Sequence, residues 1–117
     1  MVSDHKQLIV WQKGMDVVTM IYSFTKSFPK EELFGLVSQM RRSAVSIPCN
    51  ISEGRKRGTE KDYRHFLLIA LGSAAELETQ LEICRRLQYG DIAELNQIDT
   101  LLLEVLKMLS VMTKTLR

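Results

Sequence analysis

The sequence has little of what β-folds and membrane spans require. Among its 117 residues there are two prolines and six glycines, and aromatic residues make up 7%. So few Pro and Gly leave few β-turn signals, which argues against an all-β fold. No apolar run approaches the roughly 18 residues of a membrane-spanning helix. The N-terminus MVSDHKQ is too polar for a signal peptide. We therefore expect a protein that resides in the cytoplasm and does not enter a membrane.

Cysteine and histidine are also scarce, which argues against a disulfide framework or a metal centre. Cys49 and Cys84 are far apart and lack the close spacing of metal ligands, so we expect two reduced, buried thiols. Asp62 and His65 have the spacing of half a bundle metal site, but no second such pair occurs. The sequence predicts neither metal nor cofactor.

Charge is balanced overall but unevenly distributed. The formal net charge is +2, with nine Lys or Arg against five Asp or Glu in residues 1–58 and seven against nine in residues 59–117. The net charge is too small for the whole surface to bind polyanions. The asymmetry fits either a basic patch for nucleic acid or two halves of a self-complementary oligomer.

Apolar residues recur at spacings of three and four through most of the chain, which is the pattern of packed helices. We predict one all-α domain over residues 1–117, with helices at about 7–27, 35–56, 59–88 and 91–116. Near-3.5 spacing predicts left-handed packing, and short loops make consecutive helices antiparallel neighbours. The predicted architecture is an up-down-up-down antiparallel four-helix bundle.

The first helix carries two apolar stripes. The main predicted core stripe is Leu8, Trp11, Met15, Val18, Tyr22 and Thr25. The second is Val10, Gly14, Val17, Ile21, Phe24 and Phe28. The second stripe is surplus for a monomeric bundle, so it either widens the core or meets a partner.

The segment 35–57 contains a proline inside its apolar pattern. Pro48 deprives the carbonyl of Ala44 of its usual partner, so we predict a proline kink or an interruption in the second helix. Gly54 or Gly58 is expected to end this helix. Thr59 and Asp91 are predicted N-caps of the next two helices, and Gly90 is predicted to terminate the third.

A basic run extends from the middle of the second helix into the third. Its members, the candidate nucleic-acid-binding residues, are Arg41, Arg42, Arg55, Lys56, Arg57, Lys61 and Arg64. They could contact phosphates. The alternative is a solvated face at a helix C-terminus, where the dipole favours cations. Glu53, Glu60 and Asp62 dilute the run, and Tyr63 is the one interleaved aromatic residue considered for stacking on bases.

The last helix is apolar on several sides. Its apolar residues outside the core stripe could either widen the core or form a subunit interface, and we favour the interface. They are Leu101, Leu103, Leu106, Met108 and Val111.

Catalytic patterns are missing. Glu76 and Glu78 point in different directions on a helix and have no accompanying nucleophile, so they do not form an acid/base pair. One of them is expected to meet Arg41 or Arg42 across the contact between the second and third helices, as an ion pair either within the bundle or between subunits. We predict that the protein is not an enzyme.

Several ordered blocks then carry a family resemblance over about residues 9–113. They include Trp11-Gln12-Lys13, Phe28-Pro29-Lys30-Glu31-Glu32, Arg41-Arg42, Val45-Ser46-Ile47-Pro48, Glu53-Gly54, Leu71-Gly72-Ser73 and Glu76-Leu77-Glu78-Thr79-Gln80-Leu81. The chain thereby resembles the four-helix bundle proteins encoded in intervening sequences of bacterial 23S rRNA genes, sometimes labelled a ribosomal protein. Cys49 and Ser52 depart from the usual Ser and Ala of that family.

The resemblance implies bundles that assemble into rings, commonly pentamers, and no established enzymatic activity. A related bundle associates with a reverse transcriptase and is thought to bind nucleic acid through a basic surface. Our leading hypothesis is a non-enzymatic homo-oligomer that binds RNA through the basic run. The alternative is a scaffold that docks a nucleic-acid-processing protein or another partner.

Overall fold

A computed structural model describes residues 4–116 of the chain as four helices without a strand. The helices are α1 (Ile9–Thr25), α2 (Ser38–Arg57), α3 (Glu60–Leu87) and α4 (Ile92–Thr115). The prediction of an all-α chain with four helices is confirmed for these residues. The predicted domain of residues 1–117 also includes 1–3 and 117, which lie outside the described residues.

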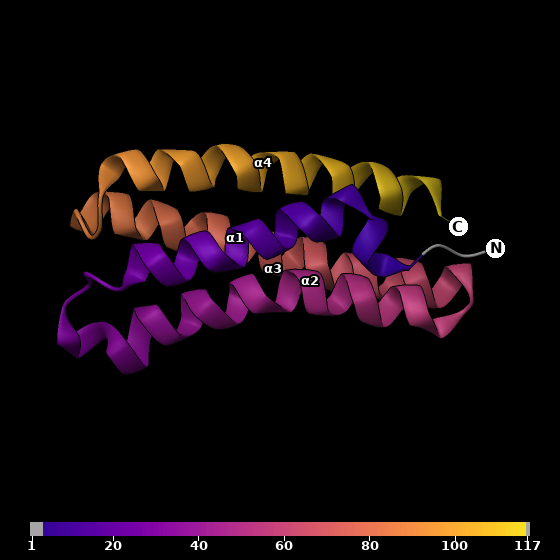
Figure 1. Cartoon of the computed structure of the whole chain (residues 1–117), viewed down its shortest axis with the longest axis horizontal. Helices are drawn as coiled ribbons and strands as arrows, with labels where there is room; N and C mark the ends of the chain where they lie inside the picture. The colour runs from indigo at the N-terminus through magenta and orange to yellow at the C-terminus, as the bar shows by residue number, and fades with distance from the viewer. Residues whose placement is uncertain (1–3, 117) are drawn as a thin grey trace.

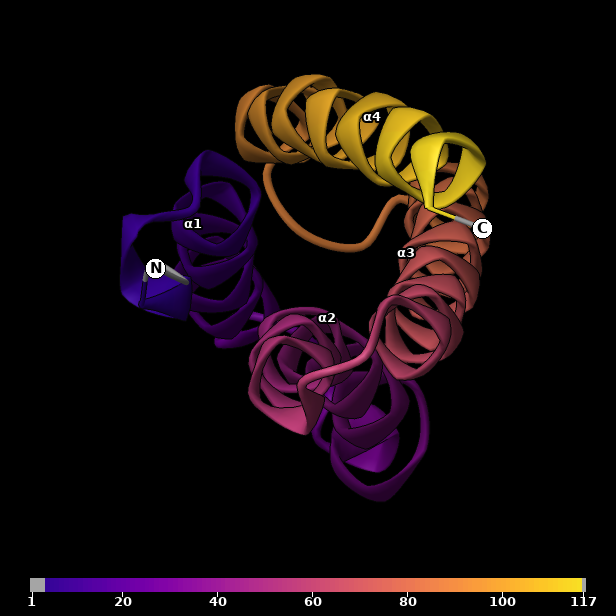
Figure 2. The same cartoon turned by 90° about the vertical axis from the view of Figure 1, so that its right-hand side faces the viewer.

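The four helices lie side by side around a shared core (Figures 1 and 2). α2 packs against α1 and α3, and α4 packs against α3 and α1. The described structure measures 46 × 24 × 21 Å. The start of α1, the end of α4 and the α2–α3 turn lie at one end of the bundle, at the right of Figure 1. The α1–α2 and α3–α4 connections lie at the other end.

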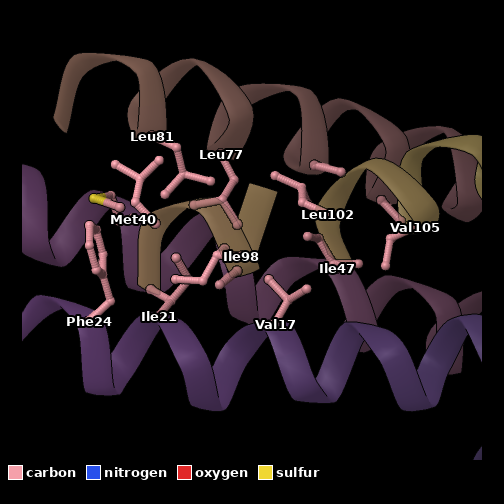
Figure 3. Close-up of a cluster of buried hydrophobic side chains, with 14 of the residues drawn as sticks. Val17, Ile21, Phe24, Met40, Ile47, Leu77, Leu81, Ile98, Leu102 and Val105 are labelled. Atoms are coloured by element: carbon pink, nitrogen blue, oxygen red, sulfur yellow. The ribbon is translucent and has the colours of Figure 1, made fainter. Parts of the chain in front are cut away.

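The core is built from the apolar stripes of all four helices (Figure 3). The sequence pattern predicts one core stripe each for α2, α3 and α4, and the buried members are Val37, Met40, Ala44, Ile47, Ile51, Leu67, Ala70, Ala74, Leu77, Leu81, Cys84, Leu95, Ile98, Leu102, Val105 and Leu109. The other predicted members, Tyr63, Met112 and Leu116, lie partly exposed at the edge of the core. Each large aliphatic side chain buried in this way contributes about 1.5–3 kcal/mol. Burial of these stripes holds the helices together.

The prediction for the core stripe of α1 was wrong. The second stripe faces inward, while Met15 and Tyr22 of the first stripe are exposed. A Cβ added to Gly14 would lie 3.4 Å from Cγ2 of Ile47 and 3.7 Å from Cβ of Pro48. Both distances are ordinary van der Waals contacts, so Gly14 lies directly against α2 on the inward-facing stripe. Thr25, predicted in the first stripe, is buried as well.

The N-caps are confirmed, and the glycine assignments need one correction. Thr59 Oγ1 accepts a hydrogen bond from the Asp62 N–H at 3.1 Å, and Asp91 Oδ1 accepts one from the Ala93 N–H at 2.7 Å. α2 ends at Gly58, which has φ +90°, and not at Gly54. α3 ends before Gly90, because Gln88 (φ 60°) already takes the left-handed conformation.

The second helix begins later than predicted and is not interrupted at its proline. A 3₁₀ turn (Lys30–Glu32) and a π turn (Leu33–Val37) precede it, with non-helical dihedrals at Gly35 (φ −108°, ψ −107°). α2 then continues through Pro48. Nδ2 of Asn50 donates to the carbonyl of Ser46 at 2.8 Å and bonds its Oγ at 2.9 Å. These bonds connect the turns on either side of the proline, and a kink there stays a prediction.

Candidate nucleic-acid interface

Five of the seven predicted basic residues lie together at the end of the bundle that holds the α2–α3 turn. Arg55, Lys56 and Arg57 form the last turn of α2, and Lys61 and Arg64 lie in the first turns of α3. We call this surface, from Arg55 to Arg64, the basic end. Arg41 and Arg42 are not part of it, because 14 residues of helix place Arg41 about 20 Å from Arg55.

Two guanidinium groups of the basic end lie over aromatic rings. Cζ of Arg55 is 5.5 Å from the centre of the Tyr63 ring, and Cζ of Arg57 is 4.9 Å from that of Phe66. Nε of Arg57 also donates to Oε2 of Glu53 at 3.0 Å. Such stacking holds an arginine while leaving its charge near the surface. Sequence reasoning missed Phe66, although its position three residues after Tyr63 places both on one side of α3.

The fold adds a basic residue from the far end of the sequence. Nε of Arg64 donates to the carbonyl of Thr113 at 2.9 Å, which joins the start of α3 to the end of α4. A groove of about 340 Å³ there is lined by Arg64, Thr113, Lys114 and Leu116. Lys114 thus joins the basic end, which sequence reasoning could not find because 50 residues separate the two cations.

The N-terminal 3₁₀ turn (His5–Gln7) lies at the same end and extends its electrostatic field. The backbone N–H of Lys6 lowers the pKa of Asp4, and the charges of His5, Lys6 and Lys56 add to this lowering. Lys56 therefore acts on the N-terminal segment across space. Cations from four parts of the chain surround this end of the bundle.

Arg41 has a structural role near the opposite end. Its Nε donates to Oγ1 of the buried Thr25 at 3.0 Å, and its Cζ lies 4.5 Å from the centre of the Tyr22 ring. These contacts attach α2 to the end of α1. Among the described residues of one chain, the predicted ion pair with a glutamate of α3 is not formed, and Oε1 of Glu76 accepts from Oγ of Ser43 at 2.7 Å. The intersubunit form of this ion pair stays a prediction.

An apolar groove lies beside Arg41, between the end of α1 and the start of α2. It has a volume of about 640 Å³. Its exposed lining residues are Tyr22, Leu33, Phe34, Val45 and Arg42. Phe34 is 93% exposed and Leu33 is also exposed. Sequence reasoning missed this surface, because Leu33 and Phe34 were left outside the predicted helices.

The α4 residues assigned to a subunit interface divide into two groups. Leu101, Leu106 and Met108 are partly buried and pack against the core, so a widened core accounts for them. Leu103 and Val111 are 46% and 65% exposed. These two are the members available to a partner.

No metal-binding group and no membrane-spanning helix is found within residues 4–116. In that range no three His, Cys, Asp or Glu side chains come close enough to hold a metal ion. None of the described helices is long and apolar enough to cross a bilayer. Both cysteines are free thiols. Cys84 is buried as predicted, but Cys49 is exposed, so the prediction that both are buried was wrong for Cys49.

The arrangement can be compared with known proteins. Residues 6–111 match the family described as 23S rRNA-intervening sequence protein. The chain belongs to that family. This confirms the resemblance drawn from the sequence.

A crystal structure of a relative extends the comparison. It is a protein of unknown function from the S23 ribosomal protein family of Bacteroides thetaiotaomicron VPI-5482, with 29% sequence identity and a TM-score of 0.82. The match covers 91% of this chain and 96% of that one. No curated protein matches this chain. Neither the family description nor the relative's name assigns a reaction.

Proposed function

We propose that this chain is a non-enzymatic RNA-binding protein whose basic end contacts the phosphate backbone. The observation that carries the proposal is the gathering of cations from α2, α3 and α4 at one end of the bundle. Lys56 and Lys61 are exposed there, and Lys114 joins them from the end of α4. Lysine and arginine side chains supply sequence-independent affinity by displacing counterions from phosphates. The family description, which refers to 23S rRNA, supports RNA as the polyanion.

The proposed binding mode is electrostatic and has little base preference. Guanidinium groups over Tyr63 and Phe66 are held in place, so less side-chain freedom is lost when a phosphate binds. Arg41 and Arg42 are left out of this interface because they lie about 20 Å away along α2.

We further propose that the protein acts in the cytoplasm as a homo-oligomer, with the ring of five copies that the family resemblance implies. Within each copy the helices are taken to run up-down-up-down with left-handed packing. The course of the chain in Figure 1 supports the alternating directions. The near-3.5 spacing of the apolar stripes supports the handedness.

Fluorescence anisotropy with a labelled RNA hairpin tests the proposal. We expect the double substitution Lys56→Glu and Lys61→Glu to weaken binding at least tenfold in low salt, because two attractive charges become repulsive. The matched control is Lys26→Glu with Lys30→Glu, which makes the same charge change at the opposite end of the bundle. We expect the control to retain most of the affinity.

The outcome that contradicts this proposal is equal loss of affinity in both double variants. Retention of full affinity when Arg55, Lys56 and Arg57 all become Glu would contradict it as well. Circular dichroism and sedimentation of each variant verify that folding and assembly are intact.

A protein-docking scaffold is the second candidate function. The observation that favours it is the exposed apolar groove at Phe34, since large exposed apolar surface is typical of partner sites. In that case substitutions in the groove abolish function while charge reversal at the basic end has little effect.

A further inference from the structure

The groove at the start of α2 presents apolar side chains next to positive charge. Phe34 is 93% exposed, and the neighbouring Leu33, Tyr22 and Val45 are exposed as well. Arg41 and Arg42 lie in the same groove. An aromatic side chain beside arginine is the composition typical of residues that dominate protein interfaces.

A complementary surface lies between α3 and α4 of the same chain. A hollow of about 470 Å³ there is lined by Glu78, Glu82, Asp99, Thr100 and Leu103. Leu103 is 46% exposed at its edge. Glu82 and Asp99 pair with Arg85 of the same chain, and Glu82 also pairs with Arg86. Within the described residues Glu78 is the lining carboxylate without an ion pair, so this surface offers Glu78 beside the apolar Leu103.

The two surfaces lie on different sides of the bundle but at the same level along it. Figure 2 shows α1 and α2 on one side and α3 and α4 on the other. Tyr22 is near the end of α1, Phe34 precedes α2, Glu82 is near the end of α3 and Asp99 is near the start of α4. All of these helix ends lie at the end of the bundle that holds the α1–α2 and α3–α4 connections.

We propose that the Phe34 groove of one copy docks on the α3–α4 surface of the next copy. This deepens the proposed homo-oligomer and rests on it, by naming the two faces that meet. Arg42, which is exposed, then faces Glu78, and Phe34 packs against Leu103. Contact of the groove with itself is disfavoured, because it would bring the arginines of two copies together.

The contact is head-to-tail, so it generates a ring if its rotation closes and a filament if it does not. Because both surfaces lie at the same level, neighbouring copies stand parallel. Their basic ends then lie on the same side of the assembly. Several basic ends on one side would engage a single RNA together, which raises the effective affinity without any new contact.

Sedimentation velocity of the full chain tests the proposal with single substitutions. We expect Phe34→Asp and Leu103→Asp each to weaken self-association by about 30-fold or more, as expected for a central interface residue. Both side chains are exposed, so folding is retained, which circular dichroism verifies. The matched control is Ile9→Asp at the start of α1, an exposed apolar residue outside both surfaces, which should associate as the unsubstituted chain does.

Mixing the two variants distinguishes this contact from others. Each variant keeps one intact surface, so an equimolar mixture should form a complex that stops at two chains. If the mixture stays monomeric, or if only one of the two substitutions disrupts association, the pairing of these surfaces is wrong. Association that survives Phe34→Asp overturns it too.

The outcomes separate this inference from the proposed function. If the unsubstituted chain stays monomeric, both the head-to-tail contact and the proposed homo-oligomer are wrong. This holds even if RNA or another protein is then found in the groove. RNA binding by a Phe34→Asp monomer, weaker than that of the assembly, leaves the basic end as the RNA site. If the Lys56 and Lys61 double variant loses RNA binding but still assembles, the result supports the basic end as the RNA site and leaves the docking of copies unaffected.

Discussion

A Cβ on Gly90 would lie only 2.4 Å from Cε1 of Phe24. The α3–α4 connection therefore crosses directly over the ring that closes this end of the core. Gly90 also has φ +78°, a conformation that L side chains rarely adopt. Both the contact with the Phe24 ring and the backbone conformation therefore require glycine at position 90.

We expect Gly90→Ala to destabilise the fold by about 2–3 kcal/mol, because the added methyl group meets Phe24 in a strained backbone conformation. Gly58→Ala isolates the backbone effect, since Gly58 has φ +90° with nothing within 4 Å; a loss of about 1 kcal/mol is expected. Gly72→Ala, in open space on α3, should instead stabilise by about 0.5–1 kcal/mol. Urea unfolding followed by circular dichroism ranks the three, and equal losses at Gly90 and Gly58 would contradict the steric argument.

The free energy of unfolding should decrease at alkaline pH because of the buried thiol of Cys84. Burial raises the pKa of its thiol from the ordinary 9.0 to about 11, with the charge of Glu32 adding to the effect. The folded state holds this proton more tightly than the unfolded state does. The contribution is therefore fully present below pH 9 and is lost as the pH rises through about 11. Unfolding free energies measured between pH 8 and about 11 should fall less steeply for Cys84→Val than for the unsubstituted chain.

The two thiols should differ sharply in reactivity. Cys49 is exposed, whereas Cys84 is buried with its Sγ 3.5 Å from Sδ of Met40. A disulfide reagent at neutral pH is expected to modify Cys49 rapidly. It should modify Cys84 only as fast as unfolding of the surrounding structure exposes that thiol. Cys49→Ser should remove the fast phase and leave the slow one. A fast phase that persists in this variant would place Cys84 at the surface.

Lys114 is expected to contribute to RNA binding although it lies far from the basic run in sequence. Lys114→Glu should weaken binding of the RNA hairpin and reduce the slope of log affinity against log salt by about 1, as for loss of one phosphate contact. Lys26→Glu, which makes the same charge change at the other end, should leave the slope nearly unchanged. Identical slopes for the two variants would remove Lys114 from the interface.

The core stripes of α2, α3 and α4 could be predicted from the sequence because their apolar residues recur at spacings of three and four, although α4 has further apolar residues on other sides. Helix ends marked by a side-chain cap could be predicted from local sequence as well, as Thr59 and Asp91 illustrate. α1 has two apolar stripes, and periodicity could not choose between them. That choice depends on contacts with the other helices, such as the contact of Gly14 with Ile47 of α2.

The candidate site shows the same division. The basic run was visible in the sequence because its charges are consecutive or nearly so. The separation of the run into two sets was not visible, because it depends on α2 continuing as a helix through Pro48, which places Arg41 about 20 Å from Arg55. Phe66 and Lys114 were identified as parts of the site only in the structure. Phe66 was identified by the guanidinium group over its ring, and Lys114 by the contact between α3 and α4.

By itself, the sequence determined the all-α class, the four helices, most of the core and the family, because each depends on local spacing or on ordered blocks of residues. The tertiary structure decided which face of α1 is buried and which cations share a surface. It also decided that Phe34 remains exposed beside arginine. Those features depend on contacts between residues distant in the chain, which no local pattern encodes.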